Sequence, residues 1–217
     1  MNDQLMERTP ESYFEIGPET PTRDKLVLVA RELFHMQGFE ATSMAQILQK
    51  SGVNSGSLYY FFKSKDDLLL AVLELYTRLL HPVLIDPLYA NVPDPLERVW
   101  ALLDGYRQML LMTGYQQGCP IGNLALEVGE RSDAIREVIM RNFEGWRVAV
   151  RKCLMDAGER LPPVVNRDQL ATFILTVMEG AVMQSRSYRS IEPYDASLAM
   201  LRDYVSRLEL SEKPKPT

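Results

Sequence analysis

The sequence predicts an all-α protein, and two observations support that fold class. Apolar residues recur at spacings of three and four over long stretches, and none alternates at period two for long enough to require a strand. Glycines, prolines and capping residues divide these stretches into segments of helical length. With 217 residues, 46% of them hydrophobic, the chain can bury a core without disulfides or metals.

The first 21 residues are predicted to form an acidic, disordered tail. They contain three prolines and carry five acidic residues against one arginine, with little periodicity. Tyr13, Phe14 and Ile16 are the side chains of this tail that could dock on another element.

The first two helices are delimited by local signals. An amphipathic helix is expected from Thr22 to about residue 37, ending at Gly38. Ser43 followed three residues later by Gln46 has the spacing of a capping box, which predicts a second, short helix ending at Gly52.

Two further helices complete the first 80 residues. A short one is expected over residues 55–62, with Leu58 and Phe62 in the core. Ser64 and Asp67 repeat the capping arrangement and begin a longer helix from Lys65 to about residue 80. We therefore expect one domain at 22–69, with its fourth helix continuing to about 80 as the only continuous element that joins it to the rest.

A second helical domain is expected over residues 81–210. Prolines 82, 87, 93 and 95 predict a connector at 81–96. Beyond it, helices are expected at about 96–112, 120–128, 132–157, 168–187 and 195–208, before a flexible tail at 211–217.

The second and third helices, separated by the turn Gly-Val-Asn-Ser-Gly, form a helix-turn-helix. A recognition helix this short needs its neighbour as a support, and it then projects side chains into a DNA major groove. Lys50, Lys63 and Lys65 flank it and can neutralise phosphates. The chain has a net charge of −5, but residues 22–66 carry six basic groups against four acids and are its net-positive stretch.

The segment from Arg23 to Leu69 resembles the DNA-binding domain of TetR-family transcriptional repressors. The resemblance rests on the order of Gly52-Val53, Gly56-Ser57-Leu58-Tyr59, Phe62 and Ser64-Lys65. It implies that Thr42 and Lys65 contact phosphates and that Tyr59 acts from the recognition helix, whereas Phe61 stands where many members have His or Tyr. The candidate DNA-binding residues are Thr42, Asn54, Ser55, Ser57, Tyr59, Tyr60, Lys63 and Lys65.

The same resemblance implies a homodimer on a palindromic double-stranded operator and an inducer site in the second domain. Two apolar stripes near the C-terminus are the candidate dimer interface. The alternative is that they form the core within one chain, which must hold for part of each stripe. The candidate interface residues are Phe173, Ile174, Val177, Met178, Leu198, Leu201 and Val205. Aromatic and methionine side chains are the candidate ligand residues, with ordinary core as the alternative: Tyr106, Met109, Phe143 and Trp146.

Cys119 is the candidate sensor. Pro120 is expected at the first position of a helix, which would place Cys119 at its N-cap, where the helix dipole favours a thiolate. The surrounding segment from Gly118 to Glu127 resembles TetR-family sensors of electrophiles and oxidants. The alternative is a small, buried, unreactive side chain, with a reversibly bound small molecule as the signal.

Other classes of protein are less compatible with the sequence. No nucleophile motif or phosphate loop predicts an enzyme, and the two cysteines and two histidines have no metal-binding spacing, so neither a metal nor a cofactor is expected. Apolar runs fall short of the roughly 18 residues of a membrane span, and no secretory signal is present, which predicts a cytoplasmic protein. A helical adaptor or small-molecule-binding protein without specific DNA binding is the remaining alternative.

Overall fold

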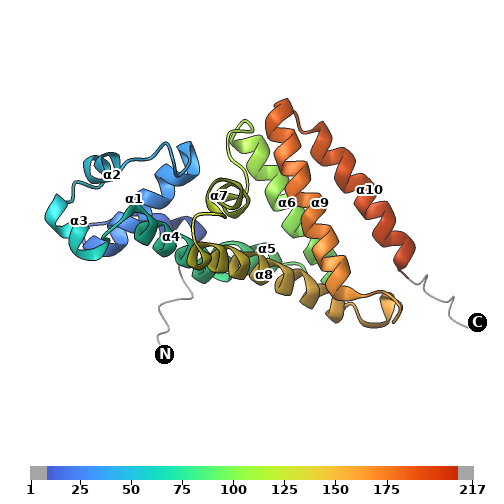
Figure 1. Cartoon of the computed structure of the whole chain (residues 1–217). Helices are drawn as coiled ribbons and strands as arrows, with labels where there is room; N and C mark the ends of the chain where they lie inside the picture. The colour runs from blue at the N-terminus through green and yellow to red at the C-terminus, as the bar shows by residue number, and fades with distance from the viewer. Residues whose placement is uncertain (1–8, 210–217) are drawn as a thin grey trace, which may run out of the picture. The chain divides into compact units, whose positions relative to one another are not determined.

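A computed structural model describes residues 9–209, and every element of regular structure in that range is helical (Figure 1). Residues 9–85 contain η2 (Pro10–Phe14), α1 (Thr22–Gln37), α2 (Met44–Ser51), α3 (Ser55–Phe61), α4 (Lys65–Leu79) and η3 (Leu80–Ile85). They are followed by α5 (Asp86–Tyr89), α6 (Pro95–Met112), α7 (Pro120–Val128), α8 (Asp133–Asp156), η4 (Gly158–Arg160), α9 (Arg167–Tyr188) and α10 (Glu192–Leu208). The all-α fold class is confirmed.

The chain divides into two compact units that do not coincide with the two predicted domains. One unit combines the residues up to Pro87 with Pro120–Phe143, and the other combines Leu88–Cys119 with the residues from Glu144 onward. Helix α8 contributes to both units, whereas the fourth helix was expected to be the only connecting element. Side-chain contacts explain why α7 and the start of α8 join the first unit: Asn142, for example, is buried and donates to the carbonyl of Leu73 at 3.1 Å.

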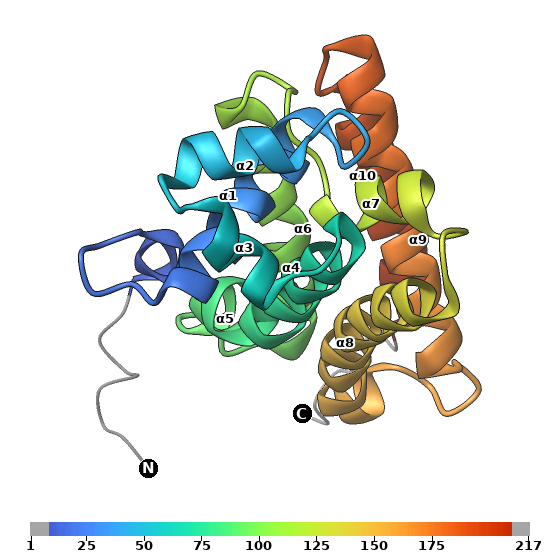
Figure 2. The same ribbon diagram turned by 60° about the vertical axis from the view of Figure 1, so that its left-hand side comes forward.

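The first unit is built around α1, which packs against α2, α3 and α4 (Figure 2). Its core consists of apolar side chains with no exposed surface, including Leu26, Ala30, Ile47, Leu58, Leu68 and Leu69. Phe62 is 3% exposed, so its predicted core role is confirmed.

Local capping sets the boundaries of the short helices. Ser43 and Gln46 form the predicted capping box of α2, and Ser64 and Asp67 form that of α4. Gly52 ends α2 with φ +64°, a left-handed conformation that favours glycine. The structure therefore confirms both predicted capping boxes. The sequence could predict them because each involves only residues close in sequence.

The N-terminal segment differs from the predicted disordered tail. Residues 10–14 form η2, which packs against η3. The guanidinium of Arg31 lies 3.7 Å from the centroid of the Phe14 ring, a cation–π contact that a local pattern does not reveal. Residues 1–8 of this predicted tail lie outside the described residues. The flexible tail predicted at 211–217 also lies outside them.

The predicted connector at 81–96 is also different, because the chain remains helical from Lys65 to Tyr89 through η3 and α5. Wider π-helical turns accommodate Pro82 here, and Leu80 and Ile85 are buried. This 25-residue stretch is long and apolar enough to cross a membrane by length and composition alone. One helix of this kind is weak evidence of a membrane span, because core helices can meet the same criteria, and 44% of its most apolar window is buried inside the protein.

The second unit contains α6, α9 and α10. Helices α9 and α10 lie side by side over most of their lengths, and α6 packs against α9 (Figure 1). Asn166 caps α9 by accepting from the amides of Asp168 and Gln169. This unit contains the predicted sensor cysteine and the predicted dimerisation helices.

Candidate DNA interface and sensor site

Helix α3 presents a polar and aromatic face to solvent. Tyr59 is 48% exposed and Tyr60 is 74% exposed, and Ser55 is also exposed. Asn54 caps the helix, because its Oδ1 accepts from the amide of Ser57 at 2.8 Å. The exposed face has hydrogen-bond donors, acceptors and ring edges of the kinds that can contact base edges in a major groove.

The three predicted flanking lysines have different environments. The ammonium of Lys63 donates to the carbonyl of Tyr59 at 2.8 Å and the side chain is exposed at the end of α3. Lys65 donates to the carbonyls of Phe39 and Thr42 at 2.9 and 3.0 Å. An ammonium has three donors, so Lys65 retains one for a phosphate. Lys50 instead pairs with Glu32 at 2.6 Å.

Thr42 does not present its side chain as the resemblance implied. It is 1% exposed, and its hydroxyl donates to the carbonyl of Gly38 at 2.7 Å. This buried hydroxyl is engaged within the domain, and the carbonyl of Thr42 accepts from the ammonium of Lys65.

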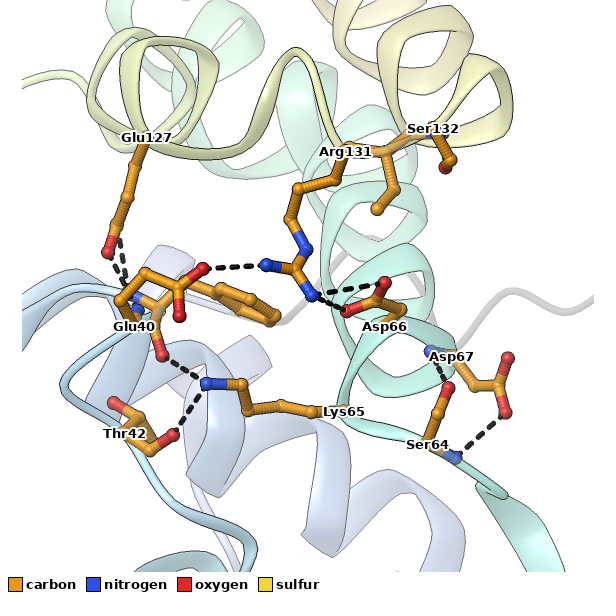
Figure 3. Close-up of polar contacts among 11 residues, drawn as sticks. Glu40, Thr42, Ser64, Lys65, Asp66, Asp67, Glu127, Arg131 and Ser132 are labelled. Atoms are coloured by element: carbon orange, nitrogen blue, oxygen red, sulfur yellow. Dashed lines mark hydrogen bonds and ion pairs between the residues drawn. The ribbon is translucent and has the colours of Figure 1, made fainter.

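Two residues that the sequence analysis did not single out contact this same turn (Figure 3). The carboxylate of Glu127, on α7, accepts from the amides of Phe39 and Glu40 at 2.9 and 2.7 Å. Arg131, between α7 and α8, pairs with Glu40 and Asp66. The sequence contained one signal for the contact made by Glu127. This residue lies in the last turn of α7, where its negative charge interacts unfavourably with the helix dipole. An acidic residue at such a position suggests a hydrogen-bond donor outside the helix.

The predicted sensor lies in the second unit. Pro120 is the first residue of α7, as expected, and Cys119 directly before it is 2% exposed. The thiol is hydrogen-bonded to the hydroxyl of Tyr106 and to the carboxyl group of Glu179. Burial raises the pKa of Glu179, and the hydrogen bond from Cys119 partly offsets that shift.

The predicted ligand residues are only partly brought together. Tyr106 and Trp146 are buried with ring centroids 5.5 Å apart, and Met109 is half-buried on the same helix as Tyr106. Phe143 belongs to the first unit, whereas Tyr106, Met109 and Trp146 belong to the second. Within residues 9–209, no three His, Cys, Asp or Glu side chains are grouped as a metal would require.

The predicted dimer interface needs correction. Four of its residues lie in the core of the chain, with exposures of 2% or less: Ile174, Met178, Leu201 and Val205. They are buried because α9 and α10 pack against each other. Phe173 is 45% exposed, and Val177 and Leu198 are partly exposed.

An outward apolar surface does exist on the same two helices. The ring of Phe173 meets that of Tyr204 edge-on at 5.6 Å, and Met200 beside them is 69% exposed. Together with Val177 and Leu201 they line an open hollow of about 570 Å³.

A short helix with an exposed polar face, supported by a second helix across a glycine turn and flanked by lysines, defines a helix-turn-helix DNA-binding protein. Comparison with known proteins agrees. Residues 26–72 match the model of the bacterial regulatory proteins of the tetR family, and residues 95–201 match the tetracyclin repressor-like C-terminal domain. The chain belongs to the TetR family of transcriptional regulators.

Individual relatives support the assignment. The transcriptional repressor DhaR of Mycobacterium sp. (strain GP1) is 30% identical over 185 residues, covering 84% of this chain and 91% of DhaR. The uncharacterised regulator YxaF of Bacillus subtilis is 30% identical over 172 residues, covering 79% and 88%. A crystal structure of reduced Escherichia coli NemR, 23% identical, superposes with a TM-score of 0.75 and covers 89% of this chain and all of that one.

Proposed function

We propose that this regulator is a cytoplasmic repressor, not an enzyme, that binds a palindromic operator as a homodimer and releases it when Cys119 is modified. The observation that carries the proposal is the environment of the Cys119 thiol, which is buried at the start of a helix between Tyr106 and Glu179. Its relative NemR, an HTH-type transcriptional repressor 24% identical over 197 residues, has been solved in a form specified as reduced. That relationship supports a thiol as the sensing group.

The two hydrogen-bond partners favour reaction at sulfur. Glu179 can take the proton of the thiol and becomes neutral when it does so, and a hydrogen bond from the Tyr106 hydroxyl to the sulfur would then stabilise the thiolate. With an α,β-unsaturated carbonyl compound, the S–C bond forms as the C=C π bond breaks, and the thiol proton is transferred to the carbon next to the carbonyl.

Burial explains why such a reaction would change the structure. A close-packed interior has no room for an added group, so an adduct on a side chain 2% exposed must displace its neighbours. The first residue of α7 directly follows Cys119 and would move with it. Release from DNA then follows if the two recognition helices of the dimer lose the spacing of the operator half-sites.

For DNA binding, we propose that Ser55, Ser57, Tyr59 and Tyr60 face the bases, with Asn54 fixing the start of their helix. Lys63 and the remaining donor of Lys65 contact phosphates. For the dimer, we propose the outward surface of α9 and α10 formed by Phe173, Val177, Met200 and Tyr204. Leu198 lines a separate hollow with Trp100 and Arg202 and is not part of this surface.

A mobility-shift titration tests the sensor proposal, using DNA upstream of the protein's own gene with and without an α,β-unsaturated carbonyl compound. We expect the compound to release the native protein and Cys153→Ser, whereas Cys119→Ser binds DNA and does not respond. Cys153 is the matched control because it is also a buried thiol, 3% exposed. A full response by Cys119→Ser would instead indicate a reversibly bound inducer, with Tyr106, Met109 and Trp146 as candidate contacts.

A further inference from the structure

We infer that Glu127 and Arg131 are positioning residues for DNA binding: they fix α7 and the start of α8 to the helix-turn-helix, so that operator affinity depends on the position of α7. The inference rests on the proposed function only where it connects α7 to a signal at Cys119. All the contacts involved lie within the first unit.

The carboxylate of Glu127 binds the turn after α1 through two hydrogen bonds at once. Its Oε2 accepts from the amide of Phe39 at 2.9 Å and its Oε1 from that of Glu40 at 2.7 Å. Gly38 makes this approach possible, because a Cβ there would lie 3.1 Å from Oε1 and the φ of +89° disfavours other residues. Two charge-assisted bonds from consecutive amides fix both the position and the orientation of the turn.

Arg131 makes the second connection, and it reaches both ends of the DNA-reading segment (Figure 3). One guanidinium nitrogen contacts Glu40 at 2.7 Å, and the other contacts Asp66, in the first turn of α4, at 3.1 Å. The guanidinium also lies 5.0 Å from the centroid of the fully buried Phe39 ring, whereas the ammonium of Lys65 lies 4.1 Å from it.

These contacts lie on either side of the helix-turn-helix formed by α2 and α3. The turn held by Glu127 leads into Ser43, which caps α2, and Asp66 follows α3 by way of Ser64, which caps α4. Helix α7 has only nine residues, Pro120–Val128, with Glu127 in its last turn and Cys119 directly before its first residue. A displacement at the start of α7 therefore reaches the turn before α2 through a single helix.

The test compares operator affinity for Glu127→Gln and Arg131→Gln in the full-length protein. Both side chains are exposed. The ion pairs of Arg131 lie at the surface and contribute little to stability, and glutamine at position 127 can still accept one of the two hydrogen bonds, so we expect Tm to change by no more than a few degrees. We expect both variants to bind the operator at least about tenfold more weakly, with the salt dependence of binding unchanged because no phosphate contact is lost.

The two substitutions change the net charge in opposite directions. A long-range electrostatic effect would therefore strengthen DNA binding by Glu127→Gln and weaken it for Arg131→Gln. Glu130→Gln and Arg136→Gln are the matched controls, since they make the same charge changes at exposed neighbouring positions. Affinity changes of opposite sign, or equal changes in the controls, would overturn the inference.

Amide hydrogen exchange gives an independent readout. The glutamine oxygen can accept from only one of the two amides, so exchange at Phe39 or Glu40 should rise at least about tenfold in Glu127→Gln and remain unchanged in Glu130→Gln. Protected amides together with native affinity in Glu127→Gln would contradict a positioning role.

The final measurement separates this inference from the sensor proposal. If modified Cys119 acts through α7, treatment with the thiol reagent should weaken operator binding by Glu127→Gln by less than about threefold. The substitution has already removed the contact between α7 and the turn after α1, so the effects of the substitution and of the reagent are not additive. If no thiol reagent releases the native protein, the sensor proposal fails, and the positioning role is still decided by the affinity, salt dependence and exchange of untreated protein.

Discussion

The hydroxyl of Tyr194, in the first turn of α10, donates to the main-chain carbonyl of Leu103 on α6 at 2.6 Å. Tyr194 is fully buried, and its own amide donates to the hydroxyl of Ser185 on α9 at 3.1 Å. Through its side chain and its main-chain amide, Tyr194 thus ties together the three helices that carry the sensor partners and the proposed dimer surface.

Tyr194→Phe removes that hydroxyl without changing the packing of the ring. We expect a loss of about 1 kcal/mol in the free energy of unfolding, the usual net value of a hydrogen bond. For a chain of this size this corresponds to a decrease of about 2–4 °C in Tm, measurable by calorimetry. Tyr188→Phe, at a position 73% exposed, should leave Tm unchanged, and an equal decrease there would argue against a specific role of the Tyr194 hydroxyl.

The salt dependence of binding distinguishes phosphate contacts from base contacts. Lys63→Ala and Lys65→Ala should weaken binding to all sequences and flatten the log–log salt slope by about one unit each. Changes at Ser55 or Ser57 should instead alter the preferred operator sequence. Lys50→Ala is the control because Lys50 is paired with Glu32. An unchanged salt slope in Lys65→Ala would show that Lys65 makes no phosphate contact and serves only to bind the carbonyls of Phe39 and Thr42.

Phe173→Asp tests the proposed dimer surface by placing a charge beside Tyr204 at a position that is already 45% exposed. The dissociation constant of the dimer should rise at least about thirtyfold, as for an interface residue worth about 2 kcal/mol, and operator affinity should fall with it. Analytical ultracentrifugation measures the first quantity. Val164→Asp, in the same unit and 89% exposed, should remain dimeric. A dimeric Phe173→Asp would place the interface elsewhere.

Glu179 predicts a pH dependence of stability. Burial raises its folded-state pKa above the ordinary 4.5, so the folded protein binds its proton more strongly than the unfolded chain does. The cost of ionising the buried group is absent below the ordinary pKa and grows as pH rises through the folded-state value. Glu179→Gln should therefore gain Tm relative to the native protein as pH increases above about 4.5. A constant difference across that range would show that Glu179 titrates like a solvated carboxyl group.

The sequence alone determined the helices whose ends depend on neighbouring residues. The capping pairs Ser43 with Gln46 and Ser64 with Asp67, together with Gly52 at the end of α2, delimit the helix-turn-helix because each signal acts within three or four residues. This local order also carried the resemblance to the family.

Tertiary structure decided which side chains are buried and which long-range contacts form, because both depend on which residues distant in sequence pack together. The Glu127 carboxylate meets the Phe39 amide 88 residues away, and Thr42 is buried where a surface contact was expected. Apolar periodicity identified the stripes on α9 and α10 but could not separate Ile174, which faces intrachain core, from Phe173, which faces solvent. Periodicity reports only that a side chain is apolar, whereas its burial depends on the helix that packs against it.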